Sequence, residues 1–171
     1  MLPKYEHTQK GSKLIYYLAI FMMFELIMIE AIIYVVGTRT AEPLSKNLLI
    51  LIMLAILLVH SLIFGLAYLM MSSLTVSIDQ EFLRLRFGGG MWKKTIPLNH
   101  ITECQPVKNT WANGWGIRCL EKGCWLYNIA GLDAVEILLQ NGKRIRIGTD
   151  EPKQLAEAIH QTIGKTTKTV L

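Results

Sequence analysis

Two long apolar segments constrain this chain more than any other feature of its sequence. Residues 14–36 and 48–71 are almost wholly apolar, and apolar residues make up 51% of the chain. An α-helix rises about 1.5 Å per residue, so roughly 20 apolar residues cross the ~30 Å hydrocarbon core of a bilayer. Both segments reach that length, and the second lacks the polar stripe of a soluble bundle helix. We therefore expect a transmembrane helical hairpin over residues 14–71.

The first segment is too long for the apolar core of a cleaved signal peptide, which spans about 7 to 15 residues.

The basic residues that flank these segments predict the orientation of the hairpin. Lysines and arginines close to the outer ends of the hairpin outnumber those of its connecting loop: Lys4, Lys10, Lys13, Arg84 and Arg86, against Arg39 and Lys46. The positive-inside rule then predicts a multi-pass protein of the cell's inner (cytoplasmic) membrane. Both termini are expected in the cytoplasm, with residues 1–13 as a cytoplasmic N-terminal segment.

Three ionisable residues, Glu25, Glu30 and His60, fall inside the predicted membrane spans. The connecting loop centres near Glu42, so Glu25 and His60 are expected at similar depth and could share a hydrogen bond between the helices. Glu30 lies about 140° further round its helix and needs another partner, either a second copy or a different protein. Such groups either hold helices together or form a proton or ion path. A path would require an oligomer, because a single hairpin encloses no channel.

From residue 72 the hydrophobic pattern changes from helical to alternating, which predicts a cytoplasmic domain over residues 72–164. Strands are expected at 74–79, 82–87, 91–98, 100–107, 115–120, 124–129 and within 134–149. Alternation places Arg84 and Arg86 on the outer face. It also places Glu136, Gln140, Arg144 and Arg146 toward water, beside a type I′ turn at Asn141 and Gly142. A helix follows from Pro152 to Gly164, and residues 165–171 form a disordered tail.

About seven antiparallel strands followed by one amphipathic helix is the element order of a pleckstrin-homology-like (PH-like) fold. That fold is a bent sheet or split barrel plugged by the helix, and another small barrel with a terminal helix is the alternative. The stretches "GWGIR", "WLYNIAGLDAVEI" and "NGKRIRIGTDEPKQLAEAI" resemble bacterial PH-like (bPH) domains of small membrane proteins. The resemblance implies an α+β membrane protein in which a transmembrane hairpin precedes the PH-like domain. It implies no particular activity.

The first hairpin loop of the domain reads "DQE", which is acidic. Eukaryotic members of the PH-like fold often bind phosphoinositides through basic residues around this loop, so inositol-lipid specificity is not expected here. Non-specific contact with anionic headgroups is expected instead from nearby basic and aromatic residues. These candidates are Arg84, Arg86, Trp92, Lys93 and Lys94. Trp115 and Trp125 are expected to fill or edge the barrel.

The cysteine spacing matches no site chemistry. Cys119 and Cys124 are separated by four residues, which fits neither a zinc pattern nor a redox pair, and we expect them close together across a hairpin. The sequence contains no nucleophile elbow, paired-carboxylate motif or phosphate loop. It also contains no nucleic-acid-binding module. Catalytic residues, cofactors, metal ions and nucleic-acid partners are therefore not predicted.

These observations predict a membrane-anchored, non-enzymatic interaction or scaffold protein. Its PH-like domain is expected to bind protein partners, a second copy of itself, or anionic lipid headgroups at the cytoplasmic surface. The alternative is an oligomeric transport or channel-accessory subunit that uses Glu25, Glu30 and His60. A hydrolase-like enzyme is a third possibility, since isolated histidines and Cys104 are present without a motif.

Overall fold

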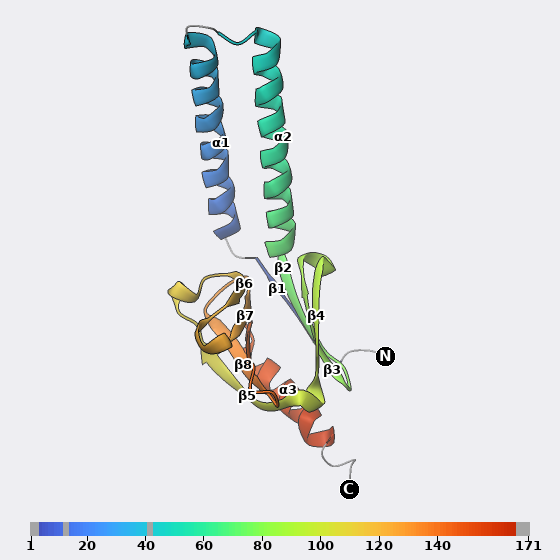
Figure 1. Ribbon diagram of the computed structural model, residues 1–171. Coiled ribbons are helices and arrows are strands. Elements are labelled where there is room, and N and C mark those ends of the chain that lie inside the picture. The colour runs from blue at the N-terminus through green and yellow to red at the C-terminus, as the bar shows by residue number, and fades with distance from the viewer. Residues whose placement is uncertain (1–3, 12–13, 41–42, 167–171) are drawn as a thin grey trace. The chain divides into compact units, whose positions relative to one another are not determined.

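The computed structural model describes residues 4–11, 14–40 and 43–166 of the chain (Figure 1). Two compact units are present. The described residues within 13–69 form a helical hairpin, and those within 1–12 and 70–171 form a sheet domain. The sheet domain is therefore discontinuous in sequence, because the hairpin is inserted into it.

The hairpin consists of α1, Leu14–Arg39, and α2, Lys46–Met71. Both helices are long and apolar enough to cross a membrane, and only 0% and 6% of their most apolar stretches are buried within the protein. A core helix of a soluble protein would be mostly buried, so these apolar surfaces need another apolar environment. Helix α1 ends three residues later and α2 begins two residues earlier than the apolar pattern predicts, because the polar ends of both segments also adopt helical structure.

The first sheet contains four antiparallel strands in the order β1-β2-β3-β4. Their bounds are Tyr5–Lys10, Ser73–Ile78, Phe82–Phe87 and Trp92–Pro97. Strand β1 precedes the hairpin and β2 follows it, yet the two pair along their whole length, from Tyr5 opposite Ile78 to Lys10 opposite Ser73. The backbone N–H of Gly11 extends the pairing by donating to the carbonyl of Ser72 at 2.8 Å. The predicted N-terminal segment is thus a structural strand of the sheet domain.

The second sheet contains five strands in the order β5-β8-β9-β7-β6. Their bounds, in chain order, are Ile101–Lys108, Gly116–Cys119, Trp125–Asn128, Asp133–Leu139 and Arg144–Gly148. The prediction of purely antiparallel strands is wrong here, because β9 inserts between β8 and β7 and runs parallel to β7. The described residues contain nine strands instead of about seven, and β1 accounts for one of the additional strands.

Two predicted turns have specific backbone geometries. Gly88, Gly89 and Gly90 between β3 and β4 all have positive φ, at 54°, 67° and 107°, which side chains other than glycine rarely adopt. In the β8–β9 turn the N–H of Gly142 donates to the carbonyl of Leu139 at 2.8 Å. Gln140 and Asn141 are therefore the central residues, and the predicted two-residue type I′ loop is not formed. Gly142, with φ 77°, occupies the left-handed position that follows them.

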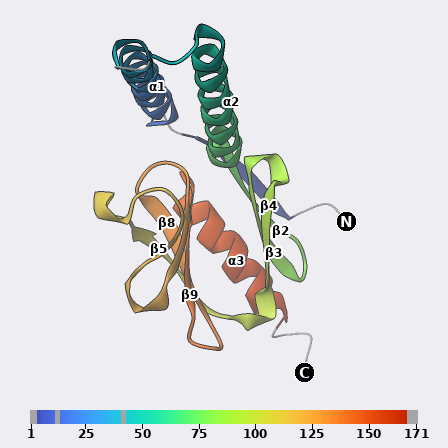
Figure 2. The same ribbon diagram turned by 45° about the horizontal axis from the view of Figure 1, so that its top comes forward.

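The C-terminal helix α3, Pro152–Thr166, lies between the two sheets (Figure 2). Its Leu155, Ala156 and Ile159 are buried in a core shared with both sheets. The alternation predicted for β3 is confirmed, since Leu83, Leu85 and Phe87 belong to the same core. The helix continues two residues past Gly164, and residues 167–171 of the predicted tail lie outside the described residues. The α+β class, with two apolar helices, two sheets and a terminal helix, is thus observed.

Candidate functional site

The predicted intramembrane groups do not pair with each other. His60 lines a hollow of about 120 Å³ between the helices together with Met22 and Leu26, which places it near the level of Glu25. No hydrogen bond joins His60 to Glu25 in the described part of the hairpin, and the buried His60 Nε2 has no partner there. Both carboxyl oxygens of Glu30 are also buried without a hydrogen bond among the described residues. Glu30 and His60 thus have buried polar atoms without a hydrogen-bond partner among the described residues.

The five predicted membrane-contact residues do not form one basic surface. Arg84 is ion-paired with Asp79, and Arg86 is ion-paired with Glu6 of β1. Lys94 lies on the inner side of β4, with Nζ 5.6 Å from the ring centre of Tyr127. Trp92 is also directed inward, where it contacts Phe87 and Tyr127. Lys93 is an exposed cation.

Trp92 belongs to an aromatic cluster that joins the two sheets. Its ring is stacked on that of Tyr127 in β7, with centroids 5.2 Å apart, and meets Phe87 edge-on at 5.6 Å. Aromatic pairs at these distances add to the stabilisation from burial alone. Packing inside the domain therefore accounts for Trp92, and this side chain is not a free surface anchor.

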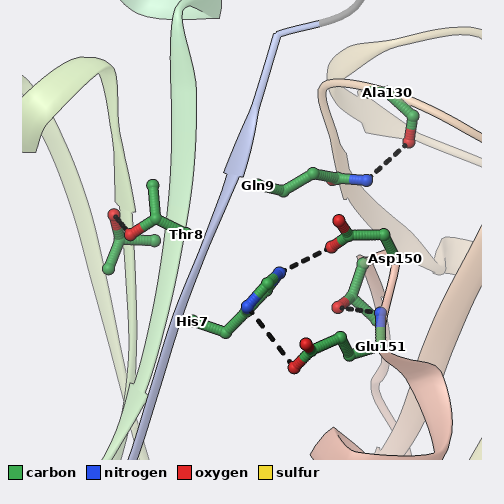
Figure 3. Close-up of polar contacts among 8 residues, drawn as sticks. His7, Thr8, Gln9, Ala130, Asp150 and Glu151 are labelled. Carbon is green, nitrogen blue, oxygen red and sulfur yellow. Dashed lines mark hydrogen bonds and ion pairs between the residues drawn. The ribbon is translucent and has the colours of Figure 1, made fainter.

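Polar side chains of β1 form a seam with the second sheet and the start of α3 (Figure 3). His7 Nε2 lies 2.6 Å from Asp150 Oδ1, and its Nδ1 lies 3.4 Å from Glu151 Oε2. Gln9 Nε2 donates to the carbonyl of Ala130 at 3.2 Å. Burial and the nearby Glu151 and Asp150 carboxylates raise the pKa of Tyr5 to about 12. The strand before the hairpin is thus attached to both sheets.

The largest departure from the sequence prediction is on the outer face of the second sheet. Glu136 was expected in water, but it is buried and only 8% exposed. Arg146 donates to Glu136 Oε2 from Nε at 3.1 Å and from Nη2 at 2.6 Å. Arg144 Nη1 lies 3.5 Å from Glu136 Oε1, and Arg146 Nη1 donates to Asn109 Oδ1 at 3.2 Å. The prediction fails because other segments cover this face.

The cover consists of the segment after β5 and the β6–β7 hairpin, and it leaves a hollow of about 580 Å³. We call it the arginine hollow. Its lining residues are Thr110, Ala112, Asn113, Cys119, Leu120, Glu121, Cys124, Glu136, Arg144 and Arg146. Charged, amide, hydroxyl and thiol groups thus converge on one concave surface.

Both cysteines of the β6–β7 hairpin line the arginine hollow. They are free thiols, with Cys119 exposed and Cys124 buried. The N–H of Leu120 donates to the carbonyl of Cys124 at 2.7 Å, so the predicted hairpin is confirmed. Burial first, and Glu136 second, raise the pKa of Cys124. A raised pKa disfavours the reactive thiolate, so Cys124 is not an activated nucleophile.

Sequence reasoning missed the arginine hollow for a physical reason. Glu136 and Arg146 are direct cross-strand partners in the β8–β9 register, and their opposite charges could have predicted an ion pair. Nothing local indicates that the pair is covered, because the covering residues are distant in sequence. In the described ranges no group of three or more His, Cys, Asp or Glu side chains could hold a metal ion.

Comparison of the chain with models of known protein families finds no match, and comparison with curated proteins finds none either.

Proposed function

We propose that this is a membrane-anchored, non-enzymatic interaction protein. Its hairpin spans the inner membrane, and its sheet domain, of the bPH type, binds partners at the cytoplasmic surface. The pairing of β1 with β2 across the hairpin carries the proposal. It connects a folded domain directly to both ends of two membrane-length helices, with no long linker on either side.

Strand pairing supports the predicted topology. Backbone partners in one sheet must lie in the same aqueous compartment, so a chain that leaves the sheet at Lys10 and returns at Ser73 must cross the bilayer an even number of times. Two helices meet that requirement. The basic residues near the outer ends of the hairpin then favour the cytoplasm for the sheet domain.

Exposed aromatic residues favour a protein partner over lipid headgroups. Trp111 is 72% exposed and Trp125 is 42% exposed, and Trp115 meets Trp111 edge-on at 5.4 Å. Tryptophan is enriched at protein interfaces, especially where it can become fully buried. The predicted lipid-binding arginines, Arg84 and Arg86, already neutralise acidic neighbours.

Site-specific photo-crosslinking in native membranes tests the interaction. A photoreactive residue in place of Trp111 is expected to give a discrete crosslinked species, which mass spectrometry then identifies. The matched control replaces Thr95, an exposed residue of β4 in the first sheet, and is expected to give no such species. Absence of adducts at both positions, together with an unaccompanied monomer in mild detergent, would contradict the proposal.

A second candidate, an oligomeric transport or channel-accessory subunit, is favoured by the unsatisfied groups of the hairpin. Glu30 and His60 each have buried polar atoms without a described partner. Intramembrane ionisable groups of this kind often mark ion or proton pathways. Flux into liposomes that contain the protein should then exceed that of empty liposomes and fall in Glu25→Gln and Glu30→Gln. Flux equal to that of empty liposomes would eliminate this candidate.

A further inference from the structure

We propose that the arginine hollow binds an oxyanion, the phosphate-type group of a small molecule. The proposal rests on the proposed interaction function and deepens it, because it names a ligand class for the covered face of the second sheet. Its volume of about 580 Å³ exceeds that of a single ion and falls in the range of small-molecule sites, roughly 300 to 1,000 Å³. The hollow is therefore large enough for a phosphate group carried on a small molecule.

Arg144 makes few contacts with the rest of the described protein. A guanidinium offers five N–H donors, and the 57% exposed side chain of Arg144 makes one contact, at 3.5 Å, with Glu136. Arg144 lines the hollow, so its remaining N–H donors are complementary to a group that only accepts hydrogen bonds.

The two arginines of the hollow have different roles: Arg146 is part of a hydrogen-bonded network, and Arg144 is proposed to contact the ligand. Arg146 is held by Glu136 and Asn109 through three hydrogen bonds, which fixes its side chain against the sheet. Glu136 is thereby engaged, and Arg144 lines the hollow with only the 3.5 Å contact to Glu136. The acidic rim residue Glu121 is exposed, so solvent screens its repulsion of an anion.

Cys119 provides a built-in reporter of occupancy. It is exposed and lines the hollow, whereas Cys104 and Cys124 are buried. The experiment measures the rate at which iodoacetamide alkylates Cys119 of the full chain in neutral detergent, by mass spectrometry, with inorganic phosphate or with chloride at equal ionic strength. Phosphate in the hollow is expected to slow this alkylation severalfold.

Arg144→Gln is expected to raise the phosphate concentration needed for half-maximal protection by roughly tenfold or more, as befits a charge-assisted hydrogen bond. The matched control is Arg118→Gln, which removes the same charge from an exposed residue of β6 outside the hollow lining. Phosphate is expected to protect Cys119 of this variant at the same concentration as in the wild type. The same thermal unfolding midpoint for both variants shows that Arg144→Gln is folded.

Two membrane arms distinguish the source of the oxyanion. Protection in nanodiscs of phosphatidylglycerol, and not of phosphatidylcholine, without added phosphate identifies a lipid headgroup. Protection by free phosphate alone identifies a soluble ligand. The proposal is overturned if neither phosphate nor phosphatidylglycerol changes the alkylation rate of Cys119. It is also overturned if phosphate protects Cys119 equally well in Arg144→Gln and in the wild type. Crosslinking at Trp111 does not require Arg144, so this site can fail while the interaction function holds.

Discussion

The two sheets of the domain carry similar charge patterns on their outer faces and use them differently. In the first sheet, Arg84 and Arg86 pair with acidic neighbours and remain more than 40% exposed. In the second sheet, Glu136 and Arg146 pair beneath a covering loop and hairpin, with side-chain exposures of 9% and 21%. Alternation determines which residues share a face. Coverage by distant segments then decides whether an ion pair is a weak surface contact or a buried network.

Removing the buried carboxylate gives the largest expected difference between the sheets. Glu136→Leu leaves Arg146 as an uncompensated, largely buried charge, and the free energy of unfolding should fall by about 3 kcal/mol. Denaturant unfolding in detergent, followed by tryptophan fluorescence, measures this change. All four tryptophans lie in the sheet domain, so the signal reports on that domain alone.

The comparison is sharpened by two further variants. Arg84→Gln in the first sheet breaks an exposed pair and should cost below about 1 kcal/mol. The double variant Glu136→Leu with Arg146→Met should recover most of the lost stability, because both charges are removed together. Equal losses for Glu136→Leu and Arg84→Gln would show that the second face is not covered.

The seam between the sheets gives a smaller expected effect. His7→Ala removes the contacts with Asp150 and Glu151 and should lower the free energy of unfolding by about 1 kcal/mol. His7→Gln, which retains one hydrogen-bond donor, is the matched control and should lose less. If His7→Ala unfolds at the wild-type denaturant midpoint, β1 is not attached to the second sheet in this way.

Alkaline unfolding tests one group with a raised pKa in each sheet. The folded-state pKa of Tyr5 is raised from 10.0 to about 12, so the neutral phenol stabilises the fold below pH 10 and that stabilisation is lost as pH rises through 12. Burial raises the pKa of Cys104 in β5 from 9.0 to about 12, with the same sign.

Tyr5→Phe and Cys104→Ala should each flatten the fall in the denaturant midpoint as pH rises above 9. A midpoint that falls equally steeply in both variants and in the wild type would contradict the two raised pKa values.

Sequence patterns predicted the parts of the fold that depend on local apolar periodicity. The two apolar helices were predicted from their long, nearly unbroken apolar composition. The core face of β3 and the amphipathic helix α3 were predicted because each buries apolar residues at a regular spacing. Strand β1 was missed because its inward residues are Tyr5, His7 and Gln9, whose weak apolar signal reflects the polar seam that they form.

The candidate site was harder to predict than the fold. Glu136 and Arg146 have the spacing of solvent-facing residues, and only the arrangement of β5, β6 and β7 around them buries the pair. The inward direction of Trp92 and Lys94 was missed for a similar reason, since both alternate onto the inner face beside Tyr127. In both cases the deciding neighbour comes from a distant strand.

The most direct test concerns the completion of the first sheet across the hairpin. The Thr8 and Thr75 hydroxyls lie 2.8 Å apart on β1 and β2, so Thr8→Cys with Thr75→Cys should form an intrachain disulfide rapidly when native membranes are mildly oxidised. The control, Thr8→Cys with Thr95→Cys, places the second thiol on β4 and should not crosslink. A rapid disulfide in the first variant alone supports a domain assembled from both sides of the hairpin. No disulfide, or equal rates in both variants, would contradict it.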